Sequence, residues 1–532
     1  MILRRAFLLG LLVAGLSWLP AQTSATGPYR IVGQVVNARG GEPVARTRVA
    51  LLAEDNGQIM AATLSDAEGN FAFDHLPAGK FPLTASHRGY RTSFYDEHEG
   101  FNSAIVTGEG QDTEHLVFRL APAAVISGTV SADEGDAVVA AQVLLVRLPD
   151  FPGDGPPQIE QAATDDTGAY EFANLGAGSY SVAARGEPWY AIHPSRAIGN
   201  ASPLDVAFPV TYFDSTVEER AAKPITVAAG DREHADIVLH AVPAVRITLP
   251  RRTTGNQSAG VEVTQAIFGI PMVAGNLQSN EGQNGTIQSV GLAPGHYFVT
   301  HGQPARTVEI NAATSAEVPP EAGLPTVTVS GTLRSSSGPL AGAYSVVLQP
   351  VPQNGARNMM MEEAHDGRFQ IASVPQGAWR VVVYEVGSGA RSLPVVSIFQ
   401  TGKSSAPDQF TVADTPVTVA VTVSHSLHRI LGFARRGGKA ASGAMILLVP
   451  RTLAAYPSLA RRDQSDSDGS FNLRDVPPGQ YTVIALQDGW KLNWQDRRTI
   501  ERYLPQGVPV EVLESSGGSA IPLPRAVEAI AP

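Results

Sequence analysis

The sequence of 532 residues contains no cysteine and only five lysines. The absence of cysteine excludes disulfide bonds, thiol catalysis, cysteine-based metal sites and lipid attachment at an N-terminal cysteine. Acidic residues outnumber basic ones by 50 to 39, which gives a net charge of -11, and the basic residues are dispersed. Nucleic-acid binding needs a concentrated positive surface, so no nucleic-acid partner is expected.

Long apolar runs are also missing once the first segment of the chain has passed. That segment, Ala6 to Leu19, follows Arg4 and Arg5 and precedes the small residues of Thr23-Ser24-Ala25. A positive start, a short apolar run and a small-residue cleavage site are typical of a bacterial export signal, and the run is too short for a comfortable membrane span. We therefore predict a signal peptide over residues 1–25, by the Sec or the twin-arginine route. The mature chain would have no membrane span and would lie in the periplasm or outside the cell.

What is present in abundance is a repeated unit built on two glycines. An aromatic or large apolar residue stands two positions after the first glycine, a second glycine stands ten positions after it, and another aromatic follows two positions later. The paired glycines are Gly69 and Gly79, Gly168 and Gly178, Gly285 and Gly295, Gly367 and Gly377, and Gly469 and Gly479. Five copies with one internal spacing indicate tandem domains.

Each copy has the pattern of a β-hairpin. Phe71 and Phe73 alternate with polar neighbours, and the turn Leu76-Pro77-Ala78-Gly79 leads into a second alternating run. Three copies have an aspartate three residues before the first glycine, where a carboxylate can accept backbone N–H bonds and close a turn. These aspartates are Asp66, Asp165 and Asp466.

Strands before and after each hairpin complete a two-sheet pattern of about seven short strands in ~80–120 residues. We therefore predict an all-β chain of tandem seven-stranded β-sandwich domains, arranged as beads on a string. The predicted sandwiches cover residues 26–120, 121–243, 244–323, 324–425 and 426–532. The third is predicted to be degenerate, because its first strand, Val245 to Leu249, lacks the glycine of the others.

The run from Ile31 and Gly33 to Ser65–Phe71 and the following Leu76-Pro77-Ala78-Gly79 resembles carboxypeptidase regulatory-like domains. Thr164–Tyr170 matches the same pattern. The resemblance implies a transthyretin-like sandwich of the carbohydrate-binding-like fold class, in tandem copies as in exported proteins of soil bacteria. In peptidases such a domain is an accessory module, which implies folding or docking and no chemistry.

Catalytic and metal-binding motifs are not found. None of the twelve histidines has a glutamate three residues later, as a zinc carboxypeptidase needs, and no Gly-x-Ser-x-Gly motif is present. The turns Asp165–Gly168 and Asp466–Gly469 offer oxygen ligands for weak calcium binding, but a hairpin turn explains them as well. We predict no enzyme activity, no cofactor and no metal site.

Aromatic residues in the loops after the hairpins are the candidate ligand-binding residues. Exposed rings can stack on sugars, and the alternative is that they cap the domain cores. The candidates are Trp189, Tyr190, Tyr212, Trp490 and Trp494. The favoured hypothesis is a non-catalytic structural or interaction protein, and the alternatives are a carbohydrate-binding protein and, more remotely, a peptidase-associated accessory protein. The expected partner is a polysaccharide or another exported or envelope protein; the sequence sets neither its identity nor the oligomeric state.

Overall fold

The structure is a computed structural model that describes most of the chain after residue 26. The described residues are 27–150, 158–194, 202–250, 261–280, 286–301, 306–319, 322–323, 326–336, 340, 342–351, 359–386, 391–400, 403–404, 407–452, 455–514 and 518–532. The predicted signal peptide, 1–25, lies outside them. Within the described part, no helix has the length and apolar character needed to cross a membrane.

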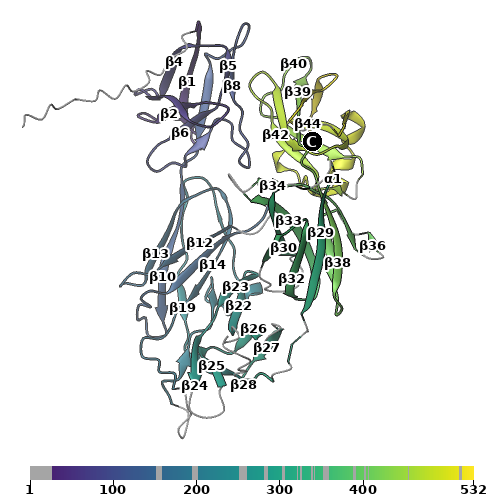
Figure 1. Ribbon diagram of the computed structural model, residues 1–532. Helices are drawn as coiled ribbons and strands as arrows, with labels where there is room; N and C mark the ends of the chain where they lie inside the picture. Colours follow the sequence, from purple (N-terminus) through teal and green to yellow (C-terminus); the bar gives the residue numbers. More distant parts are fainter. Residues whose placement is uncertain are drawn as a thin grey trace, which may run out of the picture.

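The strands fall into five consecutive groups, which we call the first to the fifth domain. Figure 1 shows the chain running down one side through the first three groups and back up the other side, so that the last domain lies beside the first. The groups span residues 29–120, 124–243, 245–317, 327–423 and 428–530. They fall within the predicted ranges, and the tandem all-β fold is confirmed; the boundaries themselves stay a prediction.

The first two domains contain strands β1 to β20. The first has β1 (Tyr29–Asn37), β2 (Arg48–Leu52), β3 (Ile59–Leu64), β4 (Asn70–Leu76), β5 (Gly79–Phe81), β6 (Leu83–Ser86), β7 (Ser93–Phe94), β8 (Ile105–Thr107) and β9 (Leu116–Leu120). The second has β10 (Ala124–Ala132), β11 (Gln142–Arg147), β12 (Gln158–Ala163), β13 (Ala169–Leu175), β14 (Gly178–Arg185), β15 (Val206–Ala207), β16 (Thr211–Tyr212), β17 (Ile225–Val227), β18 (Arg232–His234), β19 (Ile237–Leu239) and β20 (Val242–Pro243), with the short helix η1 (Glu219–Ala221).

The third and fourth domains contain strands β21 to β38. The third has β21 (Val245–Pro250), β22 (Glu262–Ile267), β23 (Ile270–Val273), β24 (Asn276–Asn280), β25 (Thr286–Leu292), β26 (Gly295–His301), β27 (Arg306–Ala312) and β28 (Ala316–Glu317). The fourth has β29 (Val327–Ser335), β30 (Ala343–Pro350), β31 (Met360–Ala364), β32 (Arg368–Val374), β33 (Gly377–Val386), β34 (Arg391–Leu393), β35 (Val395–Gln400), β36 (Lys403–Ser404), β37 (Gln409–Val412) and β38 (Val417–Val423).

The fifth domain combines strands with short helical segments. Its strands are β39 (His428–Arg436), β40 (Lys439–Ala440), β41 (Met445–Pro450), β42 (Arg461–Gln464), β43 (Ser470–Val476), β44 (Gly479–Leu486), β45 (Val508–Val512), β46 (Ala520–Pro522) and β47 (Val527–Ile530). Its helical segments are η3 (Gly489–Lys491), α1 (Arg497–Glu501) and η4 (Leu504–Gln506).

All five domains share one pairing pattern around their first strand. This strand pairs antiparallel with the first strand of the repeated hairpin and parallel with strands at the end of the domain. The register shifts at the start of the first strand in every domain. Near the shift the hairpin strand has a residue with positive φ, as in a β-bulge: His75, Asn174, Gly291, Ser373 or Asp475. The repeat therefore encodes a common register as well as a common fold.

In the first, fourth and fifth domains the glycine in the first strand makes room for the aromatic ring of the hairpin, and in the second domain Gly128 lies against the backbone of Ala235. The paired residues are Gly33 and Phe71, Gly128 and Tyr170, Gly331 and Phe369, and Gly432 and Phe471. A Cβ added at Gly331 would collide with the ring of Phe369. In the third domain Leu249 pairs with Ile287 instead, so both members of the pair have changed together. The third domain thus keeps the shared pairing without the glycine, because it has no ring to accommodate.

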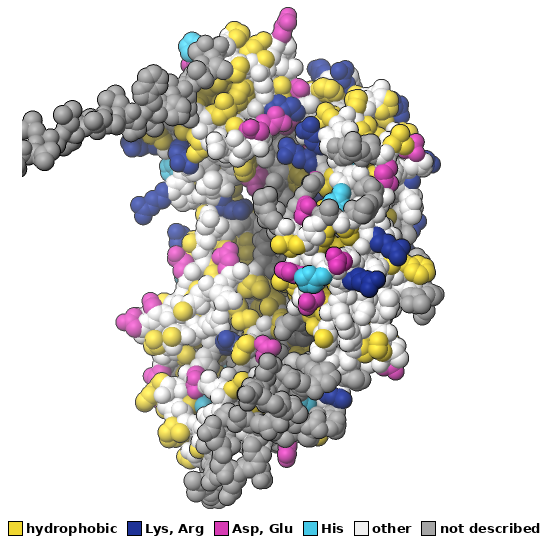
Figure 2. Space-filling model, viewed as in Figure 1, with side chains coloured by type: hydrophobic (Ala, Val, Ile, Leu, Met, Phe, Trp, Pro, Cys, Tyr) yellow, Lys and Arg dark blue, Asp and Glu magenta, His cyan; other side chains and the backbone are white. Residues whose placement is uncertain are grey.

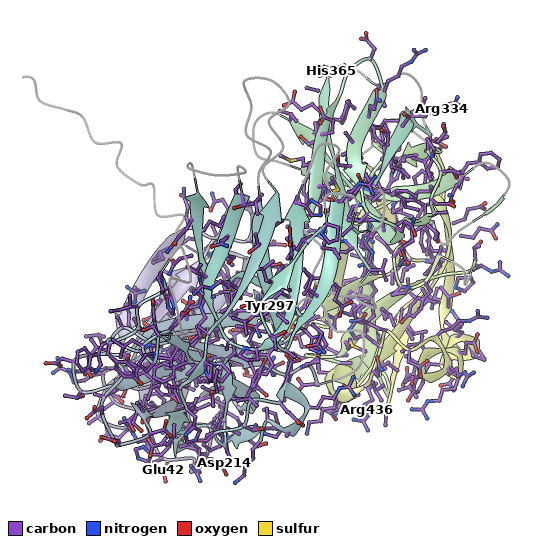
Figure 3. The ribbon with its side chains drawn as sticks, turned by 90° about the horizontal axis from the view of Figure 1, so that it is seen from below. Glu42, Asp214, Tyr297, Arg334, His365 and Arg436 are labelled. Carbon is purple, nitrogen blue, oxygen red and sulfur yellow. The ribbon has the colours of Figure 1, made fainter. Side chains whose placement is uncertain are left out.

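The second aromatic of the repeat lies in the core of each domain and anchors the hairpin turn. The polar tips of four of these side chains donate to the backbone carbonyl four residues earlier: Tyr180 to Gly176, Tyr297 to Ala293, Trp379 to Pro375 and Tyr481 to Pro477. Burial raises the pKa of the Tyr481 hydroxyl to about 12. In Figure 3 Tyr297 lies among the strands, whereas Glu42 and Arg436 lie at the periphery. Each domain has its own buried cluster of apolar side chains.

Two of the three turn aspartates act as predicted. Asp66 Oδ1 accepts hydrogen bonds from the N–H groups of Glu68, at 3.0 Å, and Asn70, at 2.7 Å. Asp165 Oδ1 accepts the equivalent bonds from Thr167 and Ala169, both at 2.9 Å. Hydrogen bonds hold the pKa of both carboxyls below the usual range, chiefly from the Asn70 backbone at Asp66 and from the Thr167 hydroxyl at Asp165. The prediction is wrong for the side chain of Asp466, which binds a different domain.

Candidate functional site

The most extensive polar and aromatic contact outside the domain cores joins the first domain to the fifth. One half is the segment 96–106, which follows β7 and extends into β8, together with Lys80. The other half is β42, the turn 465–469 and the segment 490–494 after β44. We call this contact the terminal joint. Its interacting residues are more than 360 positions apart in the sequence.

Backbone hydrogen bonds form the centre of the terminal joint. Ser467 N–H donates to the Ala104 carbonyl at 3.0 Å, and Ala104 N–H donates to Asp466 Oδ1 at 2.8 Å. Val106 N–H donates to Ser467 Oγ at 2.8 Å. Ala104 and Asp466 are buried, so these bonds replace contacts with water on both domains. The two domains are therefore held in one register.

An aromatic cluster covers one side of the joint. The Trp490 indole stacks on the His98 imidazole, with ring centroids 5.3 Å apart and planes 8° apart, and Phe101 lies 5.6 Å from it. The Arg462 guanidinium lies over the rings of Trp494, at 4.3 Å, and of Phe101, at 5.2 Å. The Arg462 guanidinium also pairs with the Glu99 carboxylate of the first domain at 2.6 Å. Such cation–π contacts contribute about 0.5–2 kcal/mol each, depending on desolvation.

A buried polar network lies between the aromatic cluster and the backbone bonds. Gln464 Nε2 donates to Ser103 Oγ at 2.9 Å, and Ser103 Oγ donates to the Ser465 carbonyl at 2.8 Å. All three residues are buried. Buried polar groups that satisfy one another across a contact specify a single geometry, because any other leaves them unpaired.

Asp466 links the repeated turn to the joint. Its Oδ2 pairs with Lys80 Nζ at 2.6 Å, and both side chains are mostly buried. Burial raises the pKa of the Asp466 carboxyl, although Lys80 acts in the opposite direction. The turn bond that Asp66 and Asp165 make in their own domains is made here by Asp468, whose Oδ1 accepts from Ser470 N–H at 2.9 Å. Asp466 has thus exchanged a local bond for a contact between domains.

Two of the five predicted ligand-binding aromatics, Trp490 and Tyr212, lie in contacts between domains, and Trp494 lies beside one of these contacts. Trp490 is 8% exposed and its indole N–H donates to the Gly443 carbonyl at 3.0 Å; Trp494 is partly buried. Tyr212 is 4% exposed and packs against Phe268 of the third domain, with ring centroids 5.2 Å apart. Trp490 and Tyr212 are therefore covered by protein on both sides of these contacts, whereas the ligand-binding role of the five aromatics stays a prediction.

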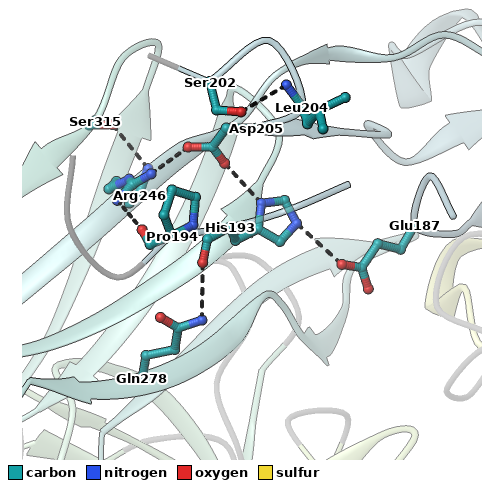
Figure 4. A network of polar contacts seen from close by, with 9 residues as sticks. All are labelled: Glu187, His193, Pro194, Ser202, Leu204, Asp205, Arg246, Gln278 and Ser315. Atoms are coloured by element: carbon teal, nitrogen blue, oxygen red, sulfur yellow. Dashed lines mark hydrogen bonds and ion pairs between the residues drawn. The ribbon is translucent and has the colours of Figure 1, made fainter. Parts of the chain in front are cut away.

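The other two predicted residues are exposed on a fixed loop. Trp189 is 85% exposed and Tyr190 38%, with their rings edge to face at 5.7 Å. The loop is held by His193, whose Nδ1 contacts Asp205 at 2.9 Å and whose Nε2 contacts Glu187 at 3.2 Å. Arg246 of the third domain pairs with Asp205 and donates to the Pro194 carbonyl (Figure 4). The two rings are therefore available to a ligand.

Sequence reasoning missed His98, Phe101 and Arg462. His98 and Glu99 lie in no recognisable motif, whereas in the structure they contact Trp490 and Arg462 of the fifth domain. No local pattern marks Phe101 or Arg462, because the residues that they touch lie in the other domain. One sequence feature does point to Trp490. The residue eleven positions after the second glycine of the repeat is tryptophan in both the second and the fifth domain, Trp189 and Trp490.

A cleft of about 790 Å³ lies beside the terminal joint, with both domains in its wall. Its charged lining residues are Glu54, Asp55, Lys80, Arg429, Arg474 and Asp475. Both signs of charge are present, so the cleft selects neither anions nor cations. Charges are also mixed across the visible face of the molecule (Figure 2). Among the residues that the structure describes, no group of three or more His, Asp or Glu side chains is placed to hold a metal ion, the two acidic turns included.

Comparison with known proteins gives a family match for the first domain. Residues 30–121 match the family model of the carboxypeptidase regulatory-like domain, which confirms the resemblance over that part of the chain. No curated protein matches the chain.

Solved structures with some similarity include the Bacillus anthracis TIE protein, at 11% identity over 93% of this chain and 74% of that one, with a TM-score of 0.17. The full-length major pilin RrgB from Streptococcus pneumoniae is 9% identical; the match covers 94% of this chain and 100% of the pilin, with a TM-score of 0.18. Two B repeat units of the collagen binding protein of Staphylococcus aureus are 12% identical; the match covers 74% of this chain and 99% of the two units, with a TM-score of 0.13. At these scores the similarities carry no argument about function.

Proposed function

We propose that this chain is an exported, non-catalytic structural protein in which five sandwich domains are held in a closed arrangement by the terminal joint. Each domain has its own core, so the contacts between domains are additional to what folding requires. Closure fixes the positions of the loops on all five domains relative to one another. A binding surface made from several domains then loses little conformational entropy when a partner binds.

The observation that carries this proposal is the burial of Trp490 between His98 and the fifth domain. Trp490, in η3 of the fifth domain, is 8% exposed: it belongs to a buried cluster with Leu447 and Ile484 of its own domain, and His98 of the first domain stacks on its ring. The joint also contains two ion pairs, Lys80 with Asp466 and Arg462 with Glu99, and a satisfied polar network. Most of these charged and polar side chains are buried, so their pairing favours a single geometry of the joint.

Small-angle X-ray scattering on the full chain tests the proposal. The Arg462→Glu variant places a like charge opposite Glu99, and Trp490→Ala removes the central ring, so both should increase the radius of gyration. Trp189→Ala, which removes an exposed ring, is the matched control and should leave it unchanged. Unchanged scattering in both joint variants would contradict the closed arrangement, and a hydrolase activity abolished by one point substitution would contradict the non-catalytic role.

Carbohydrate binding at Trp189 and Tyr190 is a second candidate, favoured by the 85% exposure of Trp189 on a loop fixed by His193 and Arg246. A ring that is already held in place can stack on a sugar at little entropic cost. Polysaccharide pull-down should detect binding that Trp189→Ala weakens by about tenfold, which corresponds to ~1.4 kcal/mol. Binding that Trp189→Ala leaves intact would exclude this site. Trp490→Ala controls for changes in domain arrangement.

A further inference from the structure

We propose that the cleft beside the terminal joint binds a short peptide, with the amino end of the peptide on the first domain and its carboxyl end on the fifth. The inference rests on the proposed function, because both walls of the cleft are present only in the closed arrangement. It goes beyond that function by assigning a ligand class and an orientation to a site that closure creates. The cleft volume of about 790 Å³ lies within the range of roughly 300–1,000 Å³ that is usual for ligand pockets.

The cleft wall from the first domain has unpaired acidic side chains. Glu54 and Asp55, in the loop between β2 and β3, are exposed and have no ion-pair partner among the described residues. Lys80 lies on the same wall, but its Nζ already pairs with Asp466 at 2.6 Å within the joint. This wall therefore offers two carboxylates to a cationic group.

The cleft wall from the fifth domain has unpaired basic side chains. Arg429 of β39 and Arg474 of β43 are exposed and make no ion pair within the described part of the chain. Asp475 also lines this wall, and its carboxylate acts on a neighbouring cation. Burial lowers the pKa of the Arg461 guanidinium, and Asp475 acts in the opposite direction. This wall therefore offers two guanidinium groups to an anionic group.

Unpaired charges of opposite sign on the two walls favour a ligand that has both charges. A simple anion or cation is attracted by one wall and repelled by the other. A free peptide has an ammonium group at one end and a carboxylate group at the other. An extended peptide spans ~3.3–3.6 Å per residue, so the number of residues adjusts the distance between its charges to the distance between the walls.

Two polar side chains on the wall of the fifth domain lack hydrogen-bond partners. Asn472 Oδ1 and both ring nitrogens of His428 are buried and make no hydrogen bond within the described part of the chain. Buried polar groups in native proteins are nearly always paired, so these groups indicate a partner that enters the cleft. Asn472 is only partly buried, and rotation of its side chain turns the amide toward the cleft. A peptide backbone suits such a wall, because each residue both donates and accepts a hydrogen bond.

Met60 provides a reporter for testing the proposal on the full chain. It lines the cleft and is 53% exposed, whereas Met361 of the fourth domain, which is 68% exposed, lies outside the cleft. Methionine methyl groups are isotope-labelled and followed by NMR, and Met60→Leu identifies the Met60 signal. The probes are oligoglycines of about three to six residues, which present only termini and backbone. We expect a saturable shift of the Met60 signal and none of the Met361 signal.

Blocked peptides and wall variants test the orientation. Acetylating the amino end or amidating the carboxyl end should each weaken binding about three- to fivefold, as expected for the loss of an exposed charge pair. Glu54→Gln/Asp55→Asn should weaken binding of the free peptide but not of the acetylated one. Arg429→Gln/Arg474→Gln should weaken binding of the free peptide but not of the amidated one. Arg436→Gln, at an exposed position of β39 outside the cleft, is the matched control and should change neither.

The outcomes separate this inference from the proposed function. If scattering supports the closed arrangement and no oligoglycine shifts the Met60 signal, the inference is wrong and the proposed function stands. An equal response to the doubly blocked peptide, or to the neutral sugar maltotriose, would also overturn the inference, since recognition would not depend on the two charges. If scattering is unchanged in both joint variants, the closed arrangement is contradicted, and the inference is wrong with it.

Discussion

The second and fifth domains contain the same hairpin unit but use two of its positions in opposite ways. Trp189 stands eleven residues after Gly178, and Trp490 stands eleven residues after Gly479. The first is 85% exposed and the second 8%. The two tryptophans therefore stand at the same position of the repeat but differ in their surroundings, because Trp490 packs into a cluster of its own domain and also stacks on His98 of the first domain.

The turn aspartates differ in the same way. Asp165 closes its own turn with two backbone hydrogen bonds, whereas Asp466 binds Lys80 and Ala104 of the first domain. The core positions of the two domains have the same environment, since Tyr170 and Phe471 are both buried and both pair with a glycine. Substitutions in the core should thus act alike in the two domains, and substitutions at the two divergent positions should not.

The largest expected effect is at the shared core position. Phe471→Ala and Tyr170→Ala should each reduce the free energy of unfolding of their own domain by ~3–5 kcal/mol, because each leaves a cavity over a glycine that has no side chain to fill it. Hydrogen exchange of the amides in β43–β44 and in β13–β14 measures the two domains separately. A loss below ~1 kcal/mol in either domain would mean that the ring is not part of its core.

The tryptophans should separate the two domains. Trp490→Ala removes a buried ring with its hydrogen bond to Gly443 and should cost ~2–4 kcal/mol. Trp189→Ala removes an exposed ring and should change stability by no more than ~0.5 kcal/mol. The same hydrogen-exchange measurement, extended to segment 96–106, should show increased exchange there only for Trp490→Ala. Equal effects of the two substitutions would remove the contrast between the domains.

These differences show how much of the molecule could be predicted from sequence. The hairpins, the turns at Asp66 and Asp165 and the core positions of Phe71 and Trp379 follow from local alternation and turn chemistry, which a repeat makes visible five times. The pairing of Leu249 with Ile287 does not follow from local patterns. It replaces a small residue by a larger one on one strand and a ring by a smaller side chain on the other, and the two strands are far apart in sequence.

The terminal joint could not be predicted for a related reason. Its contacts cross more than 360 positions, and none of its residues belongs to a motif that repeats along the chain in the same role. His98 and Arg462 acquire their contacts only when two folded domains meet. Aromatics in loops are typical both of ligand sites and of contacts between domains, and the sequence could not distinguish the two at Tyr212 and Trp490.

Asp466 and Asp165 provide a smaller and more specific contrast. Asp466→Asn weakens the ion pair with Lys80 and the bond from Ala104, and should destabilise the joint by ~1–3 kcal/mol, as expected for a charge-assisted hydrogen bond in a mostly buried site. Asp165→Asn should leave the joint unaffected, because Asp165 contacts only its own turn. Scattering with increasing urea detects opening of the joint before the domains unfold. Opening at the same urea concentration in both variants would contradict the assigned role of Asp466.

The last expected effect is a difference in the sign of pH dependence. Burial raises the pKa of the Asp463 carboxyl in the fifth domain to about 6. An acid whose folded pKa exceeds its unfolded value of 3.8 is protonated only in the folded state between these values, so the stability of the fifth domain should fall as pH rises from about 4 to about 6 and then level off. Asp165 in the second domain has a lowered pKa, so its contribution to stability is complete above pH 3.8 and is lost as pH falls below it.

Hydrogen exchange of β43 and β13, corrected for intrinsic rates, measures the two stabilities. The stability of the fifth domain should therefore decrease between pH 4 and 6, and Asp463→Asn should remove this decrease. A slope that persists in that variant would assign the titration to another group, with Asp466, whose pKa is also raised by burial, as the next to test.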